Sequence, residues 1–108
     1  MPENKKLDSS TFEIVIFSVR KGVTKSQLIE SAEPVNNWVR KQPGFLDRKL
    51  ISGDTDKLVE IVRWNSLKQA HAASELAESS PECAPMFALI DMESTTFLHG
   101  SSILQATV

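Results

Sequence analysis

The sequence contains a single cysteine, only 4 glycines and no long apolar run. Cys83 cannot form an internal disulfide, and no Cys/His cluster has the spacing of a structural zinc site. The longest apolar runs span a few residues, as from Ile14 to Phe17, so no segment is predicted to cross a membrane. No glycine-rich phosphate loop is present. The start lacks the apolar stretch of a signal peptide, so we expect a cytoplasmic protein.

The charged residues are balanced in sign. Lys and Arg together number 12 against 14 Asp and Glu, for a formal net charge of -2. Because no basic excess exists, binding to nucleic acid or to an anionic membrane surface is not predicted. Of the 108 residues, 41% are apolar and 24% are charged, which is typical of a globular protein of one domain.

Hydrophobic patterning predicts alternating strands and helices between two polar tails. We expect a flexible N-terminal tail at 1–10, a domain at 11–100 and a C-terminal tail at 101–108. Strands are predicted at 12–20, 45–52, 57–64 and 93–99, and helices at 24–42, 66–77 and 80–90. This order is typical of the α+β ferredoxin-like fold, a four-stranded antiparallel sheet with helices on one face.

Local signals set the expected ends of the helices. Thr24 with Gln27 fits a capping box, and Asn65 or Ser66 is expected to cap the next helix. Pro34 predicts a kink or a restart within the first helix. The short third helix is expected to begin around Ser80, with a disturbance at Pro85.

The second and third strands are predicted to form a hairpin around residues 53–56. A loop at 53–55 would place Ser52 opposite Asp56 and Arg48 opposite Glu60, so that opposite charges pair. A slip of one residue would move every side chain to the other face of the sheet.

Apolar side chains project from both faces of the predicted sheet. The first strand carries apolar side chains on both of its faces. On the third strand, Val59 and Ile61 project from one face, and Val62 and Trp64 project from the other. Helices can cover only one face, and an exposed apolar face of this extent is unfavourable. We therefore expect a homodimer with two sheets packed face to face.

Three segments, Pro43–Phe45, Leu58–Leu67 and 80–91, carry a family pattern. Together with the order of elements, they resemble the antibiotic-biosynthesis-monooxygenase-like proteins of the dimeric α+β barrel superfamily, over about residues 11–100. The resemblance implies a dimeric α+β barrel with a ligand cavity between sheet and helices. Activities in this superfamily include cofactor-independent oxygenation of aromatic polyketides, quinol oxidation, haem degradation and lactone isomerisation, so fold alone does not select one.

Few family site residues carry over. Trp64 resembles a tryptophan that several oxygenase members place beside the substrate. The haem-degrading members use a first-strand asparagine and a histidine that ligates haem, and neither has a counterpart here, which disfavours haem degradation. The chain also has no tyrosine, so the match to oxygenases of aromatic substrates is incomplete. No cofactor is expected.

Three residues are candidate catalytic groups. Glu60, amid apolar neighbours, would be a general base with a raised pKa or the ion-pair partner of Arg48. His71 would be a proton shuttle or a half-buried surface residue, and His99 would point into a barrel mouth or into solvent. His71 and Glu75 lie one helical turn apart, but no third ligand is evident, so no metal site is expected.

Three other residues are candidate substrate-binding groups. Trp64 would stack on a flat substrate or serve as core, and Arg48 would position the substrate or its anion. Phe87 would line an apolar pocket or pack in the core. Cys83 would be a nucleophile in a helical first turn or, more commonly, a small buried side chain.

These observations leave two functions open. One is a monooxygenase-like protein that acts without a cofactor on a small aromatic or hydrophobic compound. The alternative is a non-catalytic homodimer that binds a hydrophobic small molecule.

Overall fold

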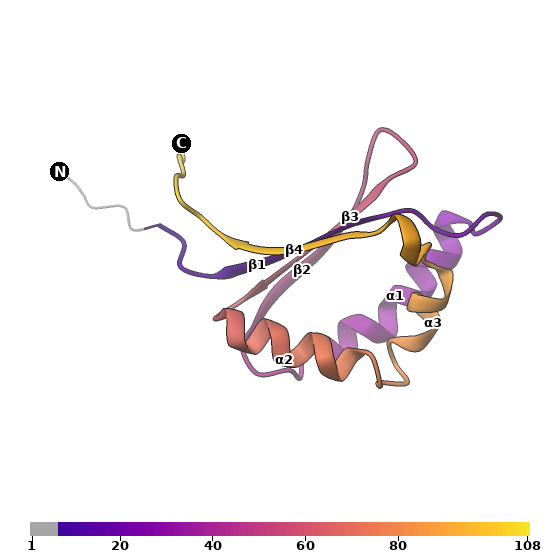
Figure 1. The fold of residues 1–108 in the computed structure, drawn as a ribbon, viewed down its shortest axis with the longest axis horizontal. Helices are drawn as coiled ribbons and strands as arrows, with labels where there is room; N and C mark the ends of the chain where they lie inside the picture. Colours follow the sequence, from indigo (N-terminus) through magenta and orange to yellow (C-terminus); the bar gives the residue numbers. More distant parts are fainter. Residues whose placement is uncertain (1–6) are drawn as a thin grey trace.

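A single antiparallel sheet with helices on one face forms the structure, a computed structural model that describes residues 7–108. The elements are β1 (Thr11–Phe17), α1 (Lys25–Val39), β2 (Phe45–Ser52), β3 (Leu58–Trp64), α2 (Leu67–Ala77), α3 (Ala84–Leu89), a 3₁₀ turn (Met92–Ser94) and β4 (Thr96–Ser101). The strand order is β2-β3-β1-β4, with every neighbouring pair antiparallel. Figure 1 shows all the helices on the same side of the sheet. The predicted ferredoxin-like α+β fold is confirmed.

The two predicted tails are described only in part. Residues 1–6 of the N-terminal tail lie outside the described residues. Asp8 Oδ2 accepts from Arg63 Nη1 at 3.1 Å, and the Asp8 amide donates to Gln105 Oε1 at 2.7 Å. Ile103 and Leu104 in the C-terminal tail are exposed. No helix in residues 7–108 is long and apolar enough to span a membrane.

Both longer helices begin at the predicted caps. The Gln27 amide donates to Thr24 Oγ1 at 3.1 Å, and the Thr24 amide donates to Gln27 Oε1 at 2.8 Å, which completes the capping box. Ser66, not Asn65, caps α2. The predicted restart at Pro34 is wrong: α1 is continuous, because its buried side chains hold one stripe against the core while Pro34 is exposed.

Two other predicted boundaries are wrong. The segment from Ser80 forms a turn, closed by the Cys83 amide donating to the Ser80 carbonyl at 3.0 Å, and α3 begins only at Ala84. Pro85 then lies in the first turn, where its missing N–H has no helical partner to lose. The 3₁₀ turn occupies the predicted start of β4, which therefore begins at Thr96.

The predicted hairpin register is wrong by two residues. Arg48 lies opposite Val62, and Ser52 lies opposite Leu58. The loop spans residues 53–57, whereas residues 53–55 were predicted. The Gly53 amide donates to the Lys57 carbonyl at 3.0 Å. Because a shift of two keeps each side chain on its face, Arg48 and Glu60 still project from the same face of the sheet.

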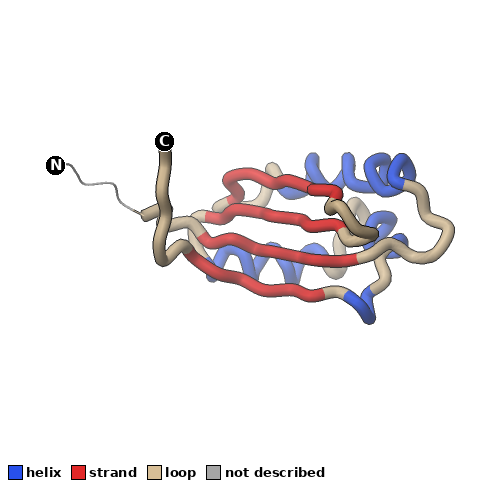
Figure 2. Tube along the Cα trace, turned by 90° about the horizontal axis from the view of Figure 1, so that it is seen from above, coloured by secondary structure: helices blue, strands red, loops and turns tan. Residues whose placement is uncertain are grey.

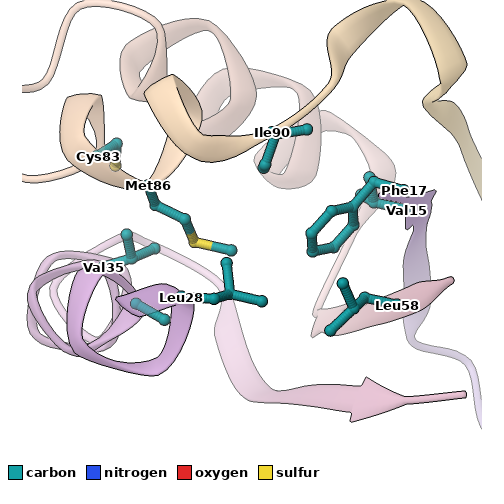
Figure 3. Close-up of a cluster of buried hydrophobic side chains, with 9 residues drawn as sticks. Val15, Phe17, Leu28, Val35, Leu58, Cys83, Met86 and Ile90 are labelled. Atoms are coloured by element: carbon teal, nitrogen blue, oxygen red, sulfur yellow. The ribbon is translucent and has the colours of Figure 1, made fainter. Parts of the chain in front are cut away.

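The two faces of the sheet differ in what covers them. The inward face carries Phe17 and Leu58, which pack against α1 and α3 with Leu28 and Met86, as Figure 3 shows. Figure 2 shows the outward face with no helix over it. That face carries Ile16, Ile51 and Leu98, with 36%, 41% and 44% of their surface exposed, and half-buried Ile14, Val59 and Ile61.

Candidate functional site

A cavity of about 630 Å³ lies between the sheet and the helices. This volume is within the range of small-molecule sites, roughly 300–1,000 Å³. The walls are mostly apolar. Their polar members are Glu13, Arg48, Glu60, Ser74, Glu78 and Thr95.

Exposed lining residues mark the opening of the cavity. Phe87 on α3, Met92 on the 3₁₀ turn and Phe97 on β4 are 36%, 60% and 49% exposed. Glu78, just past α2, is also exposed and lines the same opening. At the other extreme, Trp64 is 2% exposed. A ligand entering between α3 and β4 would therefore pass an apolar rim with one acidic side chain.

Glu13 is a buried carboxyl group in the wall of this cavity. It belongs to the inward parity of β1, and its side chain is among the buried polar groups at 9% exposure. Trp64 Nε1 donates to Glu13 Oε1 at 2.9 Å. Burial is the main cause that raises the pKa of Glu13 to about 7, with Glu60 adding to the rise, while the Trp64 bond and Arg48 oppose it. The carboxyl group therefore exchanges its proton near neutral pH.

Glu13 is not among the site residues predicted from the sequence. The sequence signal for Glu13 is that it alternates with Val15 and Phe17 and so shares one face of the strand with them. A carboxylate on the face that packs on the core is unusual.

Arg48 and Glu60 form the predicted ion pair. Arg48 Nε donates to Glu60 Oε2 at 2.6 Å, and the Arg48 side chain is only 4% exposed. Its Nη1 donates to Asn36 Oδ1 at 2.7 Å and to the Ala32 carbonyl at 3.3 Å, and Nη2 lies 3.3 Å from Met86 Sδ. These contacts connect β2 to β3, α1 and α3. Both residues line the cavity, yet each neutralises the other.

Trp64 and Phe87 line the cavity at different depths. Trp64 packs edge-to-face on Phe45, with ring centroids 5.8 Å apart, while its indole N–H is held by Glu13. Its ring is thereby fixed as a wall, and it is also a core residue. Phe87 lies at the rim. Both substrate-binding assignments stay predictions.

His71 and His99 lie together, but neither lines the cavity. Their ring centroids are 4.7 Å apart, and Phe97 packs on His99 at 5.1 Å. Burial and the neighbouring His71 lower the pKa of His99, and its Nε2 is buried without a partner among residues 7–108. Their catalytic role stays a prediction, and the geometry places them beside the cavity instead of on its wall.

Cys83 has the properties of a structural thiol. It is 1% exposed, and burial is the first cause that raises its pKa. A raised pKa leaves less thiolate, so the nucleophile interpretation loses support. Within the described part of the chain, no group of three or more His, Cys, Asp or Glu side chains is placed to hold a metal ion.

Several solved structures are similar to this chain. SnoaB, a cofactor-independent oxygenase from Streptomyces nogalater, has a TM-score of 0.67 and 19% identity over 94% of this chain and 98% of its own. The ActVA-Orf6 monooxygenase of Streptomyces coelicolor, solved with the ligand nanaomycin D, has a TM-score of 0.66 and 22% identity over 93% of each chain. A Bordetella bronchiseptica chain, provisionally described as an antibiotic biosynthesis monooxygenase, has a TM-score of 0.71 and 12% identity over 90% of this chain and 100% of its own.

At these identities the likeness establishes the architecture and leaves the reaction open. No protein-family model matches the sequence, and no curated protein matches it at a significant level. The four-stranded sheet and its helices nonetheless correspond to the folds of SnoaB and ActVA-Orf6 over nearly the whole chain. The chain therefore has the fold of the antibiotic biosynthesis monooxygenases, a ferredoxin-like α+β fold.

Proposed function

We propose that this protein is a cofactor-independent oxygenase that acts on a small aromatic compound with an acidic C–H or O–H group. One observation carries the proposal: Glu13, a buried carboxyl group with a pKa near 7, lines a mostly apolar cavity beside a fixed tryptophan ring. A base of this pKa works best near neutral pH. The similar SnoaB fold, from a protein described as a cofactor-independent oxygenase, supports the same chemistry.

In the proposed mechanism, the apolar walls desolvate the aromatic substrate and Trp64 positions its flat face. Glu13 removes a proton from an acidic CH₂ group of the substrate, leaving a carbanion that is conjugated with the ring and reacts with O₂. One oxygen atom enters the product as a carbonyl group, and the other leaves as water with the two hydrogens of the original CH₂ group. All four electrons that reduce O₂ come from the substrate, so no other reductant is needed.

Anthrone, a tricyclic ketone with an acidic CH₂ group, is a direct test substrate. We expect the protein to accelerate oxygen uptake and formation of anthraquinone, and Glu13→Gln to lower the rate by about 100-fold or more, the typical contribution of a general base. The measurement is oxygen consumption together with the absorbance of the quinone. Glu30→Gln, a change of an exposed carboxylate on α1, is the matched control and should keep the rate. No acceleration by the wild type, or full activity of Glu13→Gln, would refute the proposed reaction.

We also propose that the protein is a homodimer through the outward sheet face. Ile14 on β1 lies opposite Ile61 on β3 and Leu98 on β4, so an apolar row crosses three strands of this face. At one end of the face, Arg63 Nη2 pairs with Asp47 Oδ2 at 2.6 Å. A second sheet packed on this face would bury the apolar row, as face-to-face sheet packing requires.

Ile14→Lys tests the proposed dimer. A lysine at the centre of the apolar row would place an unpaired charge in the interface, so we expect the mass in sedimentation to fall by half. Ile29→Lys is the matched control, since Ile29 is exposed on α1, on the opposite side of the sheet, and should leave the dimer intact. A wild type that sediments as a monomer would refute the dimer, as would a folded Ile14→Lys variant that keeps the dimer mass.

A further inference from the structure

Within residues 7–108, four charged side chains line the cavity, and their signs are unequal. Three of them, Glu13, Glu60 and Glu78, are acidic, and Arg48 is basic. The signs of these side chains affect ligand binding, because a charged group that leaves water for an apolar cavity needs a partner of opposite sign. Which ligands can enter therefore depends on whether the Arg48 guanidinium is free to act as that partner.

The guanidinium of Arg48 is already engaged. It donates to Glu60 at 2.6 Å and to Asn36 at 2.7 Å, and it contacts the Ala32 carbonyl and Met86 Sδ. An incoming anion would have to displace Glu60, which would leave that carboxylate buried without its partner. The other two acidic groups of the wall, Glu13 in its ionised form and Glu78, repel anions.

From this arrangement we infer that the cavity selects electrically neutral hydroxyl-bearing aromatic ligands and excludes analogues that carry a permanent negative charge, such as carboxylates. This inference rests on the proposed function, because it concerns the ligand of the same site. A neutral hydroxyl group can donate to the Glu13 carboxylate, whereas a carboxylate ligand has no proton to donate and adds a like charge.

Proton transfer to Glu13 is compatible with this selectivity. When the Glu13 carboxylate takes a proton from a neutral ligand, the negative charge moves to the ligand and the total charge of the cavity is unchanged. The site therefore needs no extra cation to hold an anion that forms inside it. An anion that arrives from solvent adds one negative charge, and among residues 7–108 no free cationic side chain lines the cavity to pair with it.

Three naphthalene probes of equal ring size separate charge from shape. At about pH 8, where the Glu13 carboxyl group is mostly ionised, 2-naphthol is neutral and donates a hydrogen bond, 2-naphthoate is anionic, and 2-naphthamide is neutral with nearly the shape of the naphthoate. Calorimetric titration of the wild-type protein should give binding of naphthol and naphthamide at least 10-fold tighter than binding of naphthoate. Glu13→Gln removes one negative charge and should narrow the difference between naphthamide and naphthoate by about 10-fold, while Glu30→Gln, remote and exposed, should not.

The outcomes distinguish this inference from the proposed function. Equal or tighter binding of naphthoate than of naphthamide would overturn the charge selectivity and leave the proposed site standing. The inference would also be overturned by a Glu13→Gln variant that binds all three probes as the wild type does. Failure of all three probes to bind the wild type would overturn the proposed ligand site, and the selectivity with it.

Discussion

Glu13→Gln is expected to be about 3 kcal/mol more stable than the wild type at about pH 8 and equal to it at about pH 4. The folded state raises the pKa of Glu13 from 4.5 to about 7, so between these values the folded protein holds a proton that the unfolded chain has lost. The contribution of Glu13 to the stability of the wild type is therefore lost as the pH rises from about 4.5 to about 7, and it is constant above that range. Glutamine stays neutral, and its amide oxygen can still accept from Trp64.

Urea unfolding at several pH values and one protein concentration measures this difference. The groups that bear on Glu13 are Glu60, Arg48 and the Trp64 N–H, with His99 opposite it on β4. Burial lowers the pKa of His99, so its effect on stability has the opposite sign, and the comparison with Glu13→Gln isolates the contribution of the carboxyl group. Glu30→Gln should follow the wild-type profile. A wild-type stability that does not decline relative to Glu13→Gln as the pH rises would show that the carboxyl group is not buried as described.

The sequence was sufficient for the fold because each strand and helix carries its own signal. Periodicity located the elements, and the Thr24 and Ser66 caps fixed where α1 and α2 begin. The third helix was misplaced because Ser80 and Pro81 form a turn whose composition is the same as that of a helix start. Boundaries of this kind depend on tertiary packing, which local composition does not report.

The site was predicted in part, and the reasons are geometric. Arg48 and Glu60 were paired correctly in spite of the wrong register, because a shift of two residues turns opposite neighbours into diagonal ones that long side chains still bridge. Glu13 was missed because β1 is apolar on both parities, so alternation alone does not say which face the helices cover. His99 was a candidate because a side chain at the end of a strand can point into the mouth of a barrel. The strand order instead places it next to His71 on α2.

Arg48→Met is expected to lower the free energy of unfolding by about 3–5 kcal/mol, the usual cost of removing one partner of a buried ion pair. Methionine keeps much of the apolar volume, but Glu60 would remain charged in the interior without its partner at 2.6 Å. Asn36 Oδ1 and the Ala32 carbonyl would also lose their donor. The measurement is urea unfolding at neutral pH, with far-UV circular dichroism to verify that the variant folds.

Two further variants separate the loss of a partner from the loss of the side chain itself. Adding Glu60→Gln to Arg48→Met removes the uncompensated charge and should recover most of the lost stability. Arg20→Met, which changes an exposed arginine, should cost less than about 0.5 kcal/mol. A double variant no more stable than Arg48→Met would show that the stability comes from packing and hydrogen bonds of the Arg48 side chain, and not from compensation of the Glu60 charge. If the double variant regains stability and still binds 2-naphthol, Arg48 positions the wall of the cavity and does not hold the ligand.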